Sequence, residues 1–365
     1  MEKRRFLLLL LLLTFAVIVV YGSFHFRDAI FGESRQPDLR VYLHAFDTYE
    51  RGGDPYEDPG FLYTPAFVAL GNAAYRALGT ERFVVVYRAA CLVGAWLLAW
   101  ISLRLVRWPW PAQLATAVAI VASPLLANGM GCGNVTLLLA GPLALGLVVA
   151  ERRPWLGGAL TGTVNGWKPL GGAAVLLLGV AERGRRPTRE QAIFVVASIL
   201  TSGLWLLVGL RHLGGMLGKA AGRPEQVTQI SFQRAFAELG LTVPPVLVFV
   251  AVTIAGGVLV WRYARTHGER VAVALACSAI GLPVVNPNTL LLSLPAQLLA
   301  LDRAAARWRY AEPPRRRRGL VELVVVAAAI LGIHGAEGAV ATGELAFPWA
   351  GLARLVPLLE VVAIA

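Results

Sequence analysis

The chain has 365 residues, of which 57% are hydrophobic and 15% are charged, and its formal net charge at pH 7 is +12. Soluble globular proteins carry about 25% charged residues, so the composition excludes that class and indicates an all-α polytopic membrane protein. The apolar runs do not alternate as in a membrane β-barrel, and the basic residues form no face with interleaved aromatic side chains that would bind nucleic acid.

The first apolar run, residues 6–22, follows three basic residues and has no small-residue cleavage site after it, so we expect an uncleaved first helix. Eleven further runs lie at 83–103, 112–127, 135–150, 155–166, 169–182, 190–210, 244–262, 270–284, 289–302, 319–335 and 347–365. Several are shorter than the ~20 residues of a full span. We predict one integral membrane domain, residues 1–365, with about 12 (10–13) transmembrane helices.

The first long polar segment, residues 23–82, is rich in carboxylates. Six lie within 28 residues of one another: Asp38, Asp47, Glu50, Asp54, Glu57 and Asp58. Apolar and aromatic residues recur at helical spacing over 38–51, and 65–78 is helical in pattern as well. We therefore expect two short helices at the membrane surface, separated by a turn at Gly52–Gly53.

Basic residues mark every second loop between the apolar runs. The loops at 128–134, 285–288 and 336–346 hold no lysine or arginine, whereas the linker at 303–318 is strongly basic. By the positive-inside rule, this multi-pass plasma-membrane protein has both termini in the cytoplasm. Segments 23–82 and 211–243 then face the extracytoplasmic side.

The segment between 151–153 and 182–186 must cross the membrane an even number of times, because both flanking clusters are basic and therefore cytoplasmic. It is interrupted at Asn165–Pro169, where glycine and proline disfavour a continuous helix. We predict two short helices whose tip carries Lys168 towards the outer face. The alternative is that Lys168 reaches the headgroup level by extending along the membrane.

The motifs for nucleotide binding, a nucleophilic serine and a metal site are all missing from the sequence, so we expect no cofactor and no metal. Outward-facing carboxylates and cations in a helical bundle suit transfer of a sugar from a lipid phosphate. Lys168, with Arg211 or Arg234, would stabilise the leaving phosphate, and one carboxylate would serve as the base for the acceptor hydroxyl.

Three further patterns carry a resemblance to a known family. They are Asp38-Leu39-x-Val41-Tyr42 with Gly52-Gly53-Asp54-Pro55-Tyr56 and Phe61-x-Tyr63-x-Pro65, then Gly133-Asn134-Val135-x-Leu137, then Trp167-Lys168-Pro169. Together they resemble glycosyltransferase family 87, whose members are GT-C-fold enzymes typified by polyprenyl-phosphate-mannose-dependent α-mannosyltransferases. Two later segments, Thr228–Arg234 and Pro283–Leu290, depart from the family pattern.

The resemblance implies a GT-C-like bundle and an inverting hexosyltransferase in which Asp38 is the general base. The donor would be a polyprenyl-phosphate sugar, such as mannose, and the acceptor a hydroxyl of a lipid-linked or cell-envelope glycan. A transporter or flippase of lipid-linked sugars, without covalent chemistry, is the alternative; it would show interrupted helices in two related halves, which we do not find in the sequence.

The remaining candidate residues each have a structural alternative. Tyr42, Tyr56 and Tyr63 stack on sugar or anchor the loop at the headgroups, while Asp54 contacts sugar or makes a turn. Asn134 faces the sugar or caps a helix. Asn286 and Asn288 contact substrate or form a turn around Pro287.

Overall fold

The computed structural model describes residues 37–58, 60–61, 63–121, 123–179, 188–222, 240, 243–281, 287–310, 317 and 319–330, and every regular element within them is helical. The first group comprises α2 (Pro37–Glu50), η1 (Pro55–Glu57), α3 (Pro65–Leu78), α4 (Thr80–Arg104), α5 (Trp110–Val121), α6 (Pro124–Cys132), α7 (Val135–Val149), α8 (Pro154–Trp167) and α9 (Gly172–Gly179). The second group comprises α10 (Arg189–Leu207), η2 (Leu210–His212), α11 (Leu213–Gly222), α13 (Pro245–Tyr263), α14 (His267–Gly281), η3 (Pro287–Ser293), α15 (Leu294–Tyr310) and a further helix, Gly319–Ile330.

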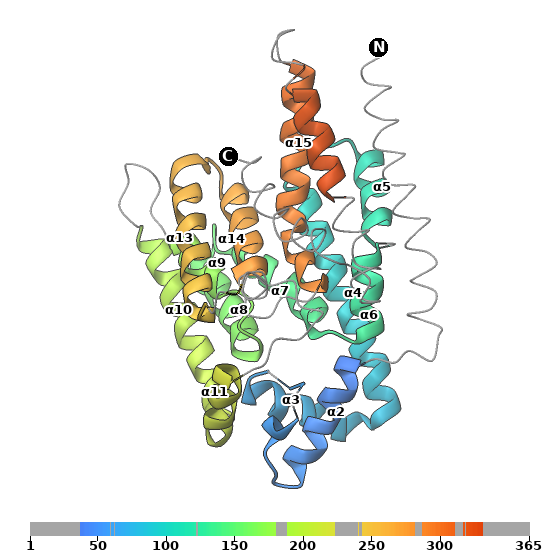
Figure 1. Cartoon of the computed structure of the whole chain (residues 1–365), viewed down its shortest axis with the longest axis vertical. Coiled ribbons are helices and arrows are strands. Elements are labelled where there is room, and N and C mark those ends of the chain that lie inside the picture. Colours follow the sequence, from blue (N-terminus) through green and yellow to red (C-terminus); the bar gives the residue numbers. More distant parts are fainter. Residues whose placement is uncertain are drawn as a thin grey trace.

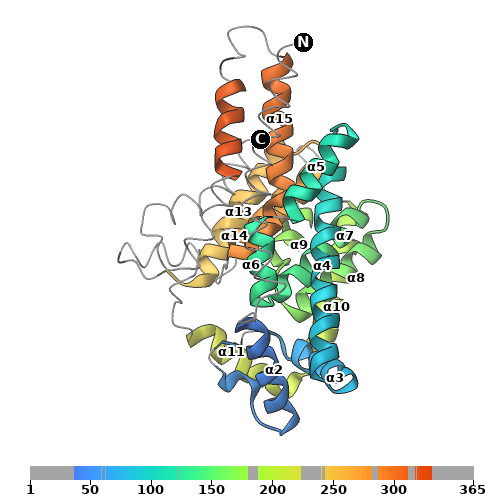
Figure 2. The same cartoon turned by 90° about the vertical axis from the view of Figure 1, so that its right-hand side faces the viewer.

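The molecule has two distinct ends. Helices α2, α3 and α11 gather at one of them, below the long helices in both views (Figures 1 and 2). We call this the loop end. The other end, which we call the basic end, contains the turns between α4 and α5, α7 and α8, and α13 and α14, together with α15. Hydrogen bonds join these elements, since His267 contacts the Leu147 carbonyl and the Trp108 indole donates to Asp302.

Glycines allow the central helices to pack closely. Helix α8 lies between α7 and α10. A Cβ atom at Gly157 would come within 2.6 Å of the Ala150 backbone on the α7 side, and one at Gly162 within 2.5 Å of the Ser198 carbonyl oxygen in α10. In a membrane, the hydrophobic effect does not drive helices together, because lipid tails are as apolar as the side chains. Small residues at the interface instead let the helix backbones approach and pack closely. The glycine-rich composition of 154–167 therefore lets α8 pack closely against both α7 and α10.

Helix α14 forms the interior of the second half of the chain. All thirteen of its residues from Glu269 to Gly281 are buried. In contrast, α10 and α13 expose apolar side chains along their length, among them Leu200, Leu204 and Ile254. A helix that is apolar all round but covered by neighbours is a core helix, whereas exposed apolar faces are those expected to meet lipid.

The number of spanning helices is smaller, in the described part of the chain, than the expected bundle of about 12. Three helices there are long and apolar enough to cross a membrane: Thr80–Arg104, Arg189–Leu207 and Val246–Tyr263. A bent pair, Trp110–Ile120 with Leu125–Cys132, would be a fourth if it forms one span. Shorter apolar helices of the described part, such as α9 with 8 residues, are below the ~20 residues of a full span.

Helical spacing, glycine and proline in the sequence correctly predicted the position of several described helices. The two helices expected in the first polar segment are α2 and α3, and the break expected at Asn165–Pro169 separates α8 from α9. One run, 112–127, is instead divided into α5 and α6, because Ser123 caps a new helix through its side-chain bond to the Leu126 amide. The expected helices at 6–22 and 347–365, and residues 223–239 of the second polar segment, lie outside the described residues.

Candidate functional site

Helix α2 carries Asp38 in its first turn at the loop end. The face of this helix next to Asp38 is buried, with Leu39, Tyr42 and Phe46 each at most 2% exposed. Because these side chains fix the rotation of α2, the half-buried carboxylate of Asp38 is directed towards the start of α7. The sequence pattern of 38–51 indicated the helix but not the neighbour that it faces.

The turn between α6 and α7 brings α2 close enough for a direct contact. Gly133 ends α6 with a φ of +70°, and a Cβ atom there would lie 2.8 Å from the Leu39 Cβ. Any larger residue would therefore be strained and would push α2 away. The next residue, Asn134, donates its Nδ2–H to Asp38 Oδ2 at 2.5 Å.

Asn134 also performs the helix-capping role that was one of its two expected functions. Its Oδ1 accepts the Thr136 amide at 2.9 Å, and its side chain is completely buried. Both ends of the amide group are thus engaged, one with the α7 backbone and the other with Asp38. The Asn134 amide is a neutral donor that orients the Asp38 carboxylate. Asn134 therefore contributes to the site without facing a sugar.

Lys168 reaches the same helix end from the break between α8 and α9. Its Nζ donates to Thr136 Oγ1 at 2.8 Å and lies 5.0 Å from the centre of the Tyr63 ring. Thr136 and Asn134 are two residues apart, and both are completely buried. The structure therefore attaches the two oppositely charged candidates, Asp38 and Lys168, to the first turn of α7.

Three of the predicted tyrosines form the packed support beneath this site. Tyr42, Tyr56 and Tyr63 are at most 7% exposed. The Tyr42 and Tyr63 hydroxyls are 2.6 Å apart, and the Tyr56 hydroxyl donates to the Tyr63 carbonyl at 2.7 Å. Burial is the main cause that raises the pKa of Tyr42 well above its ordinary value, so this hydroxyl stays protonated.

A threonine that the sequence analysis did not select joins the first polar segment to the Lys168 break. The Thr64 hydroxyl lies within hydrogen-bond distance of the carbonyls of Gly166 and Trp167, and its own amide donates to Trp167 at 3.3 Å. The signal in the sequence was only a Thr-Pro pair typical of a helix start, and Thr64 does cap α3. Its second role depends on residues about 100 positions away.

Arg211 and Asp54 lie elsewhere at the loop end. Asp54 caps η1 by accepting the Tyr56 amide at 3.0 Å, which is the turn role among its alternatives. The Arg211 guanidinium lies 4.9 Å from the centre of the Tyr49 ring. Tyr49 is eleven helical positions after Asp38, or about 16 Å along α2, so Arg211 is not brought to Lys168.

The other predicted residues are only partly covered by the structure. Arg234 and Asn286 lie outside the described residues, and Asn288 is placed only as part of η3. Within the described ranges no group of three or more His, Cys, Asp or Glu side chains is arranged to hold a metal ion. The described site brings together one carboxylate, one ammonium group and a helix N-terminus.

Comparison with known proteins gives one match. The model of glycosyltransferase family 87 matches residues 61–293, which include Tyr63, Asn134, Thr136 and Lys168, whereas Asp38 precedes the matched range. No curated protein and no solved structure matches the chain.

Proposed function

The chain belongs to glycosyltransferase family 87 and is thus a membrane glycosyltransferase, and we propose that its donor is a polyprenyl-phosphate hexose such as mannose. The acceptor is a hydroxyl of a lipid-linked or cell-envelope glycan, and transfer takes place on the extracytoplasmic side. The observation that carries this proposal is the attachment of Asp38 and Lys168 to neighbouring positions in the first turn of α7.

In the proposed reaction, Asp38 is the general base. It accepts the proton of the acceptor hydroxyl while that oxygen bonds to the anomeric carbon of the donor sugar. The bond from this carbon to the phosphate oxygen breaks, and its electron pair leaves with the polyprenyl phosphate. Displacement from the opposite face inverts the anomeric centre, so that a β-linked donor gives an α-glycoside.

Lys168 is proposed to stabilise the negative charge that develops on the leaving phosphate. An ammonium group forms strong charge-assisted hydrogen bonds with phosphate oxygens. The positive end of the α7 dipole lies beside it and acts in the same direction. Thr136 and the Tyr63 ring, both neutral, hold the Lys168 side chain in place.

The surroundings of the site favour a donor that arrives through the membrane. The turn after α10 packs against the start of α3, because Gly209 lies directly beside Pro65. In the last turn of α10, Leu204 and Leu207 are 64% and 61% exposed. An apolar surface at this level is suited to contact a polyprenyl chain while its phosphate reaches Lys168.

The decisive test replaces Asp38 by Asn in the full-length protein in lipid nanodiscs. The assay offers a panel of polyprenyl-phosphate hexoses and pentoses with membrane extract as acceptor and detects products by intact mass. We expect transfer to fall by about 10²–10⁴-fold, the usual contribution of a general base. Asp47→Asn, a half-buried carboxylate on the same helix, is the matched control and keeps its activity.

Unchanged turnover in Asp38→Asn would exclude Asp38 as the base. A second outcome concerns the reaction class. If the wild-type protein moves a labelled lipid-linked sugar across liposomes and forms no glycosidic product from any donor, transport replaces transfer as the function.

A further inference from the structure

At the basic end, a pocket of about 350 Å³ lies between the end of α13 and the middle of α15. It is remote from the loop end and takes no part in the proposed transfer reaction. Its lining consists of Arg262, Tyr263, Arg265, Arg303, Ala306 and Arg307. Four of these six residues carry a guanidinium group, so the pocket is suited to a negatively charged ligand.

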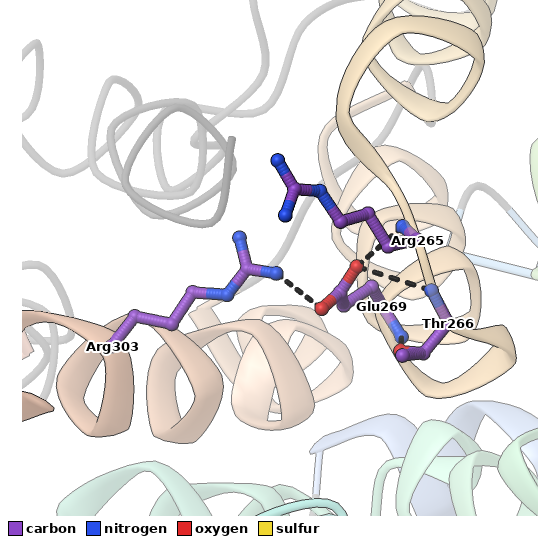
Figure 3. Close-up of polar contacts among 4 residues, drawn as sticks. All are labelled: Arg265, Thr266, Glu269 and Arg303. Atoms are coloured by element: carbon purple, nitrogen blue, oxygen red, sulfur yellow. Dashed lines mark hydrogen bonds and ion pairs between the residues drawn. The ribbon is translucent and has the colours of Figure 1, made fainter.

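Glu269 holds the Arg303 side of this pocket in place. Its Oε2 accepts the Arg265 amide at 2.6 Å and the Thr266 amide at 3.3 Å, while the Thr266 hydroxyl accepts the Glu269 amide at 3.3 Å (Figure 3). This reciprocal arrangement is a capping box that starts α14. The other carboxylate oxygen, Oε1, is bonded to Arg303, which positions that guanidinium at the pocket.

The basic charges of the pocket exceed the acidic charges that pair with them. Glu269 is paired with Arg303, and Glu322 with Arg307 at 2.7 Å. The Arg265 guanidinium makes no hydrogen bond or ion pair with the described part of the chain and extends past Glu269 to the side on which Arg303 lies (Figure 3). Arg262 lies 5.5 Å from the Tyr263 ring, a contact that leaves its charge in place. Two positive charges therefore remain for a ligand.

The position of the pocket indicates where the ligand comes from. Arg262 and Tyr263 are the last two residues of Val246–Tyr263, one of the helices able to span a membrane. Trp261 and Tyr263 are 46% and 39% exposed. Exposed aromatic and basic residues at the end of an apolar span are typical of the headgroup layer.

We propose that this pocket binds the headgroup of an anionic phospholipid. Guanidinium groups bind phosphate oxygens in pairs, and basic pockets between membrane helices bind anionic headgroups on the cytoplasmic side. Arg262 and Arg265 supply the unmatched charge, and Arg303, held by Glu269, supplies a pre-positioned donor. The bound headgroup contacts both α13 and α15 and so links the two helices.

The test measures lipid retention by native mass spectrometry on the full-length protein titrated with phosphatidylglycerol or phosphatidylcholine. The double variant Arg262→Gln/Arg265→Gln is compared with Arg152→Gln/Arg153→Gln, two exposed arginines in the α7–α8 turn outside the pocket. We expect phosphatidylglycerol binding to weaken about 30-fold in the pocket variant, since each basic residue near an anionic surface contributes roughly fivefold. The control pair keeps the affinity of the wild type.

Three outcomes overturn the proposal. Equal losses in the two double variants would show attraction by overall charge and not by a site. Equal retention of phosphatidylcholine, which has no net charge, by the wild type would show that the pocket does not select an anionic headgroup. Displacement of phosphatidylglycerol by inorganic phosphate, with phosphate binding lost in the pocket variant, would assign the pocket to a soluble phosphate. Arg262→Lys/Arg265→Lys keeps the charge without the planar fork, and we expect it to bind with an intermediate affinity.

Discussion

The contacts that hold Asp38 and Lys168 at the start of α7 differ in kind from the ion pairs of the basic end. At the loop end, an amide contacts Asp38, and a hydroxyl and an aromatic ring contact Lys168. At the basic end, Glu269 and Glu322 pair directly with arginines. A neutral partner orients a charged group, whereas a partner of opposite charge also offsets its charge and joins helices. Contacts of the first kind are therefore the better sign of a reaction site.

The largest effect is expected from removal of the Lys168 charge, which tests the contrast between the two ends. We expect Lys168→Met to lower kcat by about 10²–10³-fold, the usual loss when one group that stabilises a developing negative charge is removed. Lys168→Arg, which keeps the charge, retains more activity than the methionine variant. Turnover with a polyprenyl-phosphate hexose is measured for both.

The matching change at the basic end is Arg303→Gln. It removes one cation there as well, but we expect turnover to stay at the wild-type level because Arg303 pairs with Glu269 far from Asp38. Equal losses of kcat in Lys168→Met and Arg303→Gln would erase the distinction between the two ends.

The next largest effect concerns the amide that orients Asp38. Asn134→Ser keeps a good helix cap but is too short to reach Asp38, whereas Asn134→Ala loses both contacts. We expect kcat to fall at least about tenfold in both variants, since hydrogen bonds to charged groups contribute about 1.5–3 kcal/mol. Only the alanine variant should also lose thermal stability.

The two variants separate orientation of Asp38 from helix capping. Wild-type kcat in Asn134→Ser, with a loss only in Asn134→Ala, would mean that Asn134 acts only as a structural cap.

A smaller effect, on stability alone, is expected at Glu269. Glu269→Gln keeps an acceptor for the Arg265 and Thr266 amides but loses the ion pair with Arg303. We expect the free energy of unfolding to fall by about 1–2 kcal/mol, less than for a fully buried pair, because Arg303 is partly exposed. Thermal unfolding in detergent measures this change, with Glu190→Gln, an exposed first-turn carboxylate of α10, as control.

Should Glu269→Gln lower turnover while its unfolding temperature stays unchanged, the basic end would have a role in catalysis. In that case direct charge pairing would no longer distinguish a structural region from a reactive one.

The smallest effect is expected at His212, beside Arg211. Partial burial, followed by the neighbouring Arg211 charge, lowers the pKa of His212, so the neutral ring accepts the Arg211 Nε–H at 2.9 Å. A lowered pKa contributes stability above the unfolded-state value of about 6.5, and this contribution is lost as the pH falls through the folded-state value. The protection of the α11 amides, measured relative to their intrinsic exchange rate at each pH, should therefore fall on acidification, and His212→Gln should remove that dependence.

Local signals made part of the site predictable. Glycine and proline marked the break that carries Lys168, and a Gly-Asn pair marked the cap of α7. The contact from Asn134 to Asp38 joins positions 96 apart, and the contact from Lys168 to Thr136 joins positions 32 apart. No periodicity within one helix reports which side chains meet across the bundle, so Thr136 and Thr64 were not selected. For the same reason Arg211 was grouped with Lys168 although it packs on Tyr49.

The hydrogen bonds of Thr64 have a consequence for the time at which a newly made molecule becomes active. They join positions 102 and 103 apart in the chain. At a synthesis rate of about 5–20 residues per second, roughly 5–20 s pass between the addition of Thr64 and that of its partners. During this interval Asp38 is present but Lys168 is not. Under the proposed mechanism, the nascent protein therefore cannot act on lipid-linked sugars until α8 has been made and has met the first polar segment.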